Sequence, residues 1–300
     1  LTSSHWLDPL SIRFSFDVRN LSSSAAITFL SPKPMALFQR ARIIAGSVII
    51  DDVDYVGRTV TMLGRLSSPG RVMNESIMGT GAASDSTLAI ASGTLDTILA
   101  SDARTMCTDL SFLGLFSQHK WIPAGLMGSL VIELELNSDA SYSTSGSADW
   151  IIENPVIFCN EKILDSALQN KYVEHIMSGK NMPISMSCMA TTLHIVSTSD
   201  FTVALARGFS RLNSFFLTLF NSNESNANAL HNFYHPAGSG AMTKAGDSVR
   251  LQVQIGAKKL PEYEISSQSE FFMRLFEAVG ILTGESSMNI TTRQYHSNAF

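Results

Sequence analysis

The chain has 300 residues, of which 45% are hydrophobic and only 16% are charged, against about 25% charged residues in an average soluble domain. This composition excludes a disordered, collagen-like or coiled-coil protein, and the length fits two compact domains. The net charge of −5 and the pI near 5.8 argue against a nucleic-acid-binding protein with a basic face, whose pI normally exceeds about 9.

Short runs of alternating apolar and polar residues dominate the sequence, and such runs predict β-strands with one buried face. In chain order they are residues 14–18, 26–31, 39–50, 129–137, 152–159, 184–197, 201–206, 214–220 and 249–255. The two clearest runs place on their apolar faces Leu130, Ile132, Leu134 and Leu136, and Val249, Leu251, Val253 and Ile255. We therefore predict an all-β chain whose core contains these side chains.

Two segments instead repeat apolar residues every three or four positions, which is typical of helices. The first follows Asn160, a residue type that caps helices, and ends at Gly179. The second begins at Ser267, has Glu270 at the spacing of a capping box, and ends at Gly280. Polar stretches at 67–93, 137–149 and 221–246 predict long surface loops.

The cysteines indicate the redox compartment in which the protein is made, and the hydropathy indicates whether the chain can span a membrane. Cys107, Cys159 and Cys188 are an odd number without Cys-x-x-Cys spacing, which predicts reduced thiols in a protein made in a reducing compartment. No stretch of the sequence reaches the roughly 18 apolar residues that a membrane span needs. We therefore expect no transmembrane segment in these residues.

An internal repeat relates the two halves of the chain. Residues Arg40, Gly46, Asp52 and Asp54 recur, 210 positions later, as Arg250, Gly256, Glu262 and Glu264. Residues 27–30 resemble 217–220 at an offset of 190, and the difference between the offsets falls in the polar loop 221–246, where an insertion is tolerated. We predict two copies of one β-domain, the first in residues 1–150 and the second in residues 151–300, preceded there by a linking strand and helix. Because few residues follow Tyr263, we expect the second copy to be truncated at its C-terminus.

The repeated arginines suggest a shared structural role. Arg40 and Arg250 are the only basic residues at matching positions of the two copies. We hypothesise that they form equivalent ion pairs, so that Arg40→Ala and Arg250→Ala would impair assembly similarly.

The sequence signals for metal ligands are weak. His231 and His235 have a spacing known from zinc ligands, but they lie in a polar loop without a nearby cysteine. The cluster of Asp51, Asp52 and Asp54 could bind calcium, although its partial recurrence at residues 262 and 264 favours a structural role in the turn. We predict no metal site.

Candidate catalytic residues are equally weak. Glu133 and Glu135 alternate on one strand, about 7 Å apart, which suits an inverting glycosidase, but exposed acids on a solvated strand are far commoner. The sequence has no phosphate-binding loop and no Gly-x-Ser-x-Gly motif. We predict that the protein is not an enzyme and uses no cofactor.

Four segments carry a family resemblance: RARIIAGSVIIDDVDYVGRT, FSQHKWIPAGLMGSLVIELELNSDAS, WIIENPVIFCNEKILDSALQNKYVEHIMSG and LQVQIGAKKLPEYEISSQSEFFMRL. They lie in both halves and cover about a third of the chain. In these segments the chain resembles the double jelly-roll major capsid proteins of DNA viruses, particularly those related to polinton-like viruses.

The resemblance implies a fold and an assembly. Each β-domain would be a jelly roll, an eight-stranded sandwich of two sheets, so that residues 1–150 hold the first and residues 151–300 the second, with short helices in connecting loops. Three chains would form a pseudo-hexameric trimer, and trimers would tile an icosahedral shell. The low charge content fits this assembly, because the cores of protein interfaces are depleted in charged residues.

The resemblance also implies partners and a location. The main partner is the chain itself, first as a homotrimer and then as a capsid lattice, with minor capsid or vertex proteins as further partners. The expected location is the virion, assembled in the reducing interior of a host cell. Because the chain lacks a cationic arm that would neutralise phosphate, we expect no direct contact of this region with nucleic acid.

Two other functions stay open. One is a single jelly-roll capsid protein with a projecting β-domain, which would have one barrel and one unlike domain. The other is a carbohydrate-binding or hydrolytic β-sandwich, which requires a groove lined by aromatic residues. Trp6, Trp121 and Trp150 are too scattered in the sequence to predict such a groove.

Overall fold

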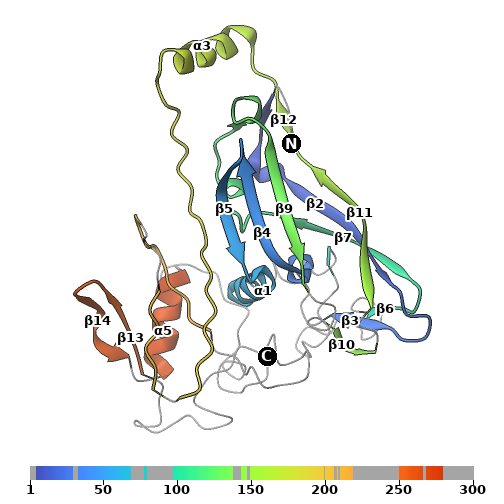
Figure 1. Cartoon of the computed structure of the whole chain (residues 1–300), viewed down its shortest axis with the longest axis vertical. Helices are drawn as coiled ribbons and strands as arrows, with labels where there is room; N and C mark the ends of the chain where they lie inside the picture. The colour runs from blue at the N-terminus through green and yellow to red at the C-terminus, as the bar shows by residue number, and fades with distance from the viewer. Residues whose placement is uncertain are drawn as a thin grey trace. The chain divides into compact units, whose positions relative to one another are not determined.

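The computed structural model (Figure 1) describes residues 5–29, 33–68, 78–79, 97–137, 143–146, 149–198, 200–205, 208, 210–218, 250–265 and 268–279. The chain divides into two compact units. Unit 1 comprises Leu1–Thr61 and Glu75–Leu193, and unit 2 comprises Met62–Asn74 and His194–Phe300. The predicted linking strand and helix after residue 150 therefore lie in unit 1, because the strand pairs with a sheet of that unit.

Unit 1 contains one long antiparallel layer made of three short sheets. The central sheet has the order β11 (Trp150–Phe158), β2 (Arg13–Asn20), β7 (Ala103–Asp109). The same lateral order continues in two flanking sheets: β10 (Ser143–Gly146), β3 (Ile27–Phe29), β6 (Thr97–Ile98), and β12 (Glu161–Lys162), β1 (Trp6–Leu7), β8 (Ile122–Pro123).

The second layer of unit 1 is a fourth sheet with the order β5 (Val48–Asp54), β4 (Phe38–Ala45), β9 (Leu130–Leu136). The two layers meet through aromatic side chains. Phe14 and Phe16 lie on the buried face of β2, and their ring centroids are 5.8 and 5.7 Å from that of Phe38 on β4. These contacts place the core of unit 1 between the two layers.

The predicted apolar face of β9 joins this core at one end only. Leu130 is fully buried, and Ile132 and Leu134 pack against the core while partly exposed. Leu136 departs from the prediction because it is 47% exposed. It is the last residue of β9 and pairs with Phe38 at the first position of β4, so the sheet ends there and leaves its side chain uncovered.

Three α-helices occur in the described residues: α1 (Val56–Leu66), α3 (Ser166–Met177) and α5 (Gln268–Val279). Short 3₁₀ turns are Pro9–Ser11, Pro34–Leu37, Gly114–Phe116 and Ala124–Leu126. Helix α3 is capped by Asp165, whose side chain accepts from the Ala167 N–H, and not by Asn160. The predicted start was therefore several residues too early. No described helix is long and apolar enough to cross a membrane.

The described part of unit 2 consists of the end of helix α1 from Met62, the hairpin β13 (Leu251–Ile255) and β14 (Lys258–Ile265), helix α5, and segments without regular secondary structure. Ile265 is its only buried hydrophobic residue within the described ranges. Leu251 and Val253 are half-buried and Ile255 is 49% exposed, so the predicted core face of β13 is only partly covered; Val249 lies outside the described residues.

The predicted strands at 184–197, 201–206 and 214–220 are wrong in their described parts, which have no regular secondary structure and join no sheet, because alternation alone does not supply a partner strand. The matching segments 27–30 and 217–220, one in each half of the chain, can be compared only in part, since residues 30 and 219–220 lie outside the described ranges. The described chain is mostly strands in small antiparallel sheets with short helices, which confirms the all-β class.

Candidate functional site

The repeat glycines occupy matching places in two hairpins. Gly46 has φ +53° and connects β4 to β5, and Gly256 has φ +62° and connects β13 to β14. Such positive φ values favour glycine. The strand ends that flank the turns pair in the same way, Ala45 with Val48 and Ile255 with Lys258. A helix follows each hairpin, α1 after β5 and α5 after β14.

The repeat arginines form ion pairs that differ between the hairpins. Arg40 donates two hydrogen bonds to Asp52, at 2.8 and 2.7 Å, which raises the pKa of Arg40. Arg250 lies 3.9 Å from Glu264. At the offset of 210, Asp52 corresponds to Glu262 and Asp54 to Glu264. Arg250 therefore pairs with the counterpart of Asp54, whereas Arg40 pairs with Asp52. The side chain of Arg40 is 33% exposed and that of Arg250 is 72% exposed.

Arg40→Ala is therefore expected to lower the unfolding temperature measurably, whereas Arg250→Ala is expected to leave it nearly unchanged. A bidentate arginine–carboxylate pair has fixed, charge-assisted hydrogen bonds, and an exposed, longer pair contributes little. Thermal unfolding followed by circular dichroism compares the two variants. Equal decreases in the unfolding temperature of the two variants would contradict the expected difference between them and would support the hypothesis of equivalent ion pairs.

The acids proposed as calcium or glycosidase candidates do not converge. Asp51 faces the core and Asp52 faces Arg40, on opposite sides of β5. Glu133 pairs with Arg42 at 3.3 Å. In the described ranges no group of three or more His, Cys, Asp or Glu side chains could hold a metal ion. His231 and His235 lie outside the described residues.

Asp51 instead joins three segments of unit 1. Its buried carboxylate, 3% exposed, accepts from the Gly114 N–H at 2.7 Å and from the Asp52 N–H at 3.0 Å. It also accepts from the side chain of Cys188. Burial raises the pKa of Asp51, and these hydrogen bonds partly oppose that effect.

Cys188 belongs to a segment that we call the strap, residues 182–191. Its side chains at Ile184, Met186 and Met189 pack against the core of unit 1, and the Thr191 hydroxyl donates to the Asp54 carbonyl. The strap is thus held to β5 at two points and to the core by apolar contacts. All three cysteines, including Cys107 and Cys159, are free thiols.

The buried carboxylate makes stability depend on pH. Because the pKa of Asp51 is higher in the folded chain than its unfolded value of about 3.9, the folded state binds more protons, and its stability falls as the pH rises through that interval. Asp51→Asn cannot titrate, so the stability of the wild type relative to the variant should decrease as the pH rises above about 4. Each tenfold difference in proton affinity corresponds to about 1.4 kcal/mol. Urea unfolding at several pH values measures this difference, and a constant difference would contradict the assignment.

Aromatic residues that are distant in sequence meet at one end of unit 1, which we call the aromatic end (Trp6, Trp121 and Tyr172). Trp6 on β1 and Tyr172 on α3 have ring centroids 4.7 Å apart. The ammonium of Lys162 lies 5.7 Å from the centroid of the Trp121 ring. Trp6 pairs with Lys162 on β12 and with Pro123 on β8, which brings these residues together.

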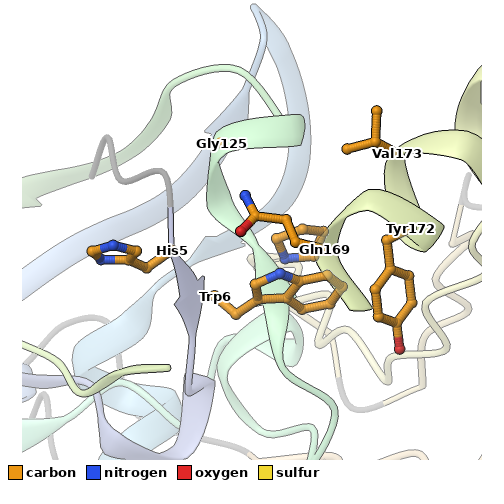
Figure 2. Close-up of a pocket in the computed structure, with 7 residues that line it drawn as sticks. His5, Trp6, Gly125, Gln169, Tyr172 and Val173 are labelled. Atoms are coloured by element: carbon orange, nitrogen blue, oxygen red, sulfur yellow. The ribbon is translucent and has the colours of Figure 1, made fainter. Parts of the chain in front are cut away.

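A hollow of about 230 Å³ opens at this end (Figure 2). Its lining residues come from β1 and the residue before it, from β8 and the following turn, and from α3: His5, Trp6, Pro123, Gly125, Gln169, Tyr172 and Val173. In Figure 2 the Gln169 side chain lies beside the Trp6 ring. The His5 ring nitrogen Nδ1 is 2.8 Å from the Glu161 carboxylate at the rim. The hollow offers apolar ring faces with an amide beside them.

The sequence contained no signal for the aromatic end. Trp6 and Trp121 are 115 residues apart in the sequence, yet the antiparallel pairing of β1 with β8 places their segments side by side. Trp150, the third tryptophan, is buried elsewhere, on β11. Only the strand pairing reveals that Trp6 and Trp121 belong to adjacent segments of one sheet.

Comparison with known proteins yields no family model and no curated protein that matches this chain.

Proposed function

We propose that this chain is the major capsid protein of an icosahedral virus, built of two tandem jelly rolls that self-associate into pseudo-hexameric trimers and then into a shell. In this proposal the protein is not an enzyme. It acts through its surfaces, is located in the virion and has further copies of itself as its principal partner. The family resemblance of the four sequence segments supports this choice among all-β proteins.

The observation that carries the proposal is the exposure of large apolar side chains on unit 1, although this unit has a buried core of its own. Phe158 at the end of β11, Ile163 after β12 and Met177 at the end of α3 are all more than half exposed. Extensive exposed apolar surface marks sites of protein association. Contacts with neighbouring copies would remove these side chains from water.

The matching hairpins of the two halves support the tandem arrangement. Both have the order strand, glycine turn, strand, helix. In the alternative with one jelly roll and an unlike projecting domain, no such correspondence is expected between the halves.

The native mass of the purified chain tests the proposal. We expect trimers or larger particles in analytical ultracentrifugation at micromolar concentration. Ile163→Asp should shift the distribution toward monomers, because it places a charge in an interface core, whereas Asn170→Asp on the exposed surface of α3 should not. A stable monomer in the wild type would overturn the proposal.

One observation favours a second candidate, a carbohydrate-binding β-sandwich. The half-buried rings of Trp6 and Tyr172 beside the Gln169 amide provide the combination of apolar faces and few polar groups found in small-molecule sites. A glycan array tests this candidate. Binding that is lost in Trp6→Ala would support it, and the absence of binding to any glycan would exclude it for the ligands on the array.

A further inference from the structure

The strap, residues 182–191, belongs to no sheet in the described part of the chain. It follows α3 and precedes Leu193, after which the chain passes to unit 2 at His194. Its residues have no regular secondary structure, so no ladder of backbone hydrogen bonds fixes it. Attachment of the strap to unit 1 therefore depends on individual contacts.

The pattern of burial along the strap changes at its middle. Partly buried side chains alternate with exposed ones as far as Met186 and resume, one position out of phase, at Met189. The change falls at Ser187 and Cys188. Their backbone lies so close to Gly114 that a methyl group there would be 2.8 Å from the Ser187 carbonyl carbon. The tightest contact of the strap with unit 1 is thus at these two residues.

At this contact the thiol of Cys188 donates a hydrogen bond to the buried Asp51 carboxylate. The carboxylate also accepts from the N–H groups of Gly114, at 2.7 Å, and Asp52, at 3.0 Å. All three partners are donors, which suits an ionised carboxylate because it can only accept. Loss of the thiol proton would turn one donor into a negatively charged acceptor that faces another negative charge.

The titratable groups around the thiol all disfavour a thiolate or face away from it. Cys188 is the only titratable residue of the strap, and the turn Gly114–Phe116 has none. On β5, Asp51 faces the thiol, whereas Asp52 pairs with Arg40 on the other side of the strand. Burial and then the charge of Asp51 raise the pKa of the Cys188 thiol.

From this arrangement we propose that the strap is a proton-dependent latch, attached to unit 1 while Cys188 carries its proton and released when the thiol ionises. Because the attached state holds the proton more tightly, attachment is complete below the pKa of a free thiol, about 8.5. It is lost as the pH rises beyond that value. Release frees the ten residues of the strap, which span at most about 36 Å when extended. The latch would thereby control the length of the connection that leads to unit 2.

Proteolysis of the full chain by subtilisin at about pH 7 and about pH 10 tests the latch. Cys188→Ser is the reference, because its hydroxyl can still donate to Asp51 but does not ionise in this range. The rate of cleavage within residues 182–191 of the wild type is divided by that of Cys188→Ser at the same pH, which cancels the pH dependence of the protease. We expect a ratio near one at the lower pH and an increase of at least about threefold at the higher pH. A ratio that does not change with pH would overturn the proposal.

Three further variants assign the effect to the thiol–carboxylate pair. Cys188→Ala lacks the donor, so its strap should be cleaved faster than that of Cys188→Ser at both pH values. Asp51→Asn offers an amide that can donate to a thiolate, so the increase with pH should disappear. Cys107→Ser, a matched loss of a thiol on β7, should keep the increase. The proposal would be overturned by slow cleavage of Cys188→Ala, by an increase that persists in Asp51→Asn, or by its loss in Cys107→Ser. None of these outcomes depends on capsid assembly, since the variants are compared in the same oligomeric state.

Discussion

Replacing Phe16 by alanine is expected to destabilise unit 1 by about 3–5 kcal/mol, the range for phenylalanine-to-alanine changes in protein cores. Phe16 is 1% exposed. Its ring centroid lies 4.9 Å from that of Phe14 on the same strand and 5.7 Å from that of Phe38 on the facing sheet. The substitution removes the central ring of this cluster and leaves a cavity between the two layers. Urea unfolding followed by far-UV circular dichroism measures the loss.

Phe158→Ala is the matched control for this substitution. Phe158 lies on β11, in the same sheet as Phe16, but is 57% exposed. The stability of the isolated chain should change by less than about 0.5 kcal/mol. A loss as large as that of Phe16→Ala would show that the core does not lie between the two layers as described.

Gly114→Ala is expected to cost about 1–3 kcal/mol, as overpacking of a tight contact does, and to loosen the strap. A methyl group at Gly114 would lie 2.8 Å from the carbonyl carbon of Ser187 and 3.2 Å from the amide nitrogen of Cys188, with the Ser187 carbonyl oxygen closer still. These atoms are backbone and cannot rotate away. Limited proteolysis should therefore cut residues 182–191 faster in the variant, and urea unfolding gives the loss of stability.

Gly208→Ala provides the control for the added methyl group. A methyl group at Gly208 would meet no atom within 4 Å. The stability of the Gly208→Ala variant should stay within about 0.5 kcal/mol of that of the wild type. If Gly114→Ala were equally neutral and the strap equally resistant to proteolysis, the close contact between Gly114 and Ser187 would not exist in solution.

Most of the longer strands of unit 1, strand β13 and the two later helices could be predicted because their signals are local, whereas the predicted strands at 184–197, 201–206 and 214–220 are not strands in their described parts. In β2 the alternation of Phe14, Phe16 and Val18 with polar residues survives in the structure as a buried and an outward face. Helix α1 was missed, since Val56, Gly57 and Thr59 have low helix propensity. Val56 and Val60 are nevertheless buried, which indicates that tertiary packing outweighs propensity here.

The candidate site was less predictable because its parts are remote in sequence. The glycine turns at 46 and 256 were identified from the repeat, and both turns lie in hairpins. The role of Asp51 as a buried hydrogen-bond acceptor could not be predicted, because an acidic residue in an acidic run gives no sign that its carboxylate enters the core. Only the approach of Gly114 and Cys188 supplies the donors that make burial of this charge tolerable.

Local periodicity and turn chemistry thus specify the all-β class, the hairpins and the helices α3 and α5, because a side chain's direction along a strand or helix depends on its nearest neighbours in the chain. The extent to which those faces are covered depends on segments far away in sequence. The same kind of alternating strand is buried in β4, whose Phe38 packs against Phe14 and Phe16 of the facing layer, and only half-buried in β13 within the described part of the chain. Coverage of an apolar face therefore required the tertiary structure, since burial depends on which segments pack over that face and not on the sequence of the strand itself.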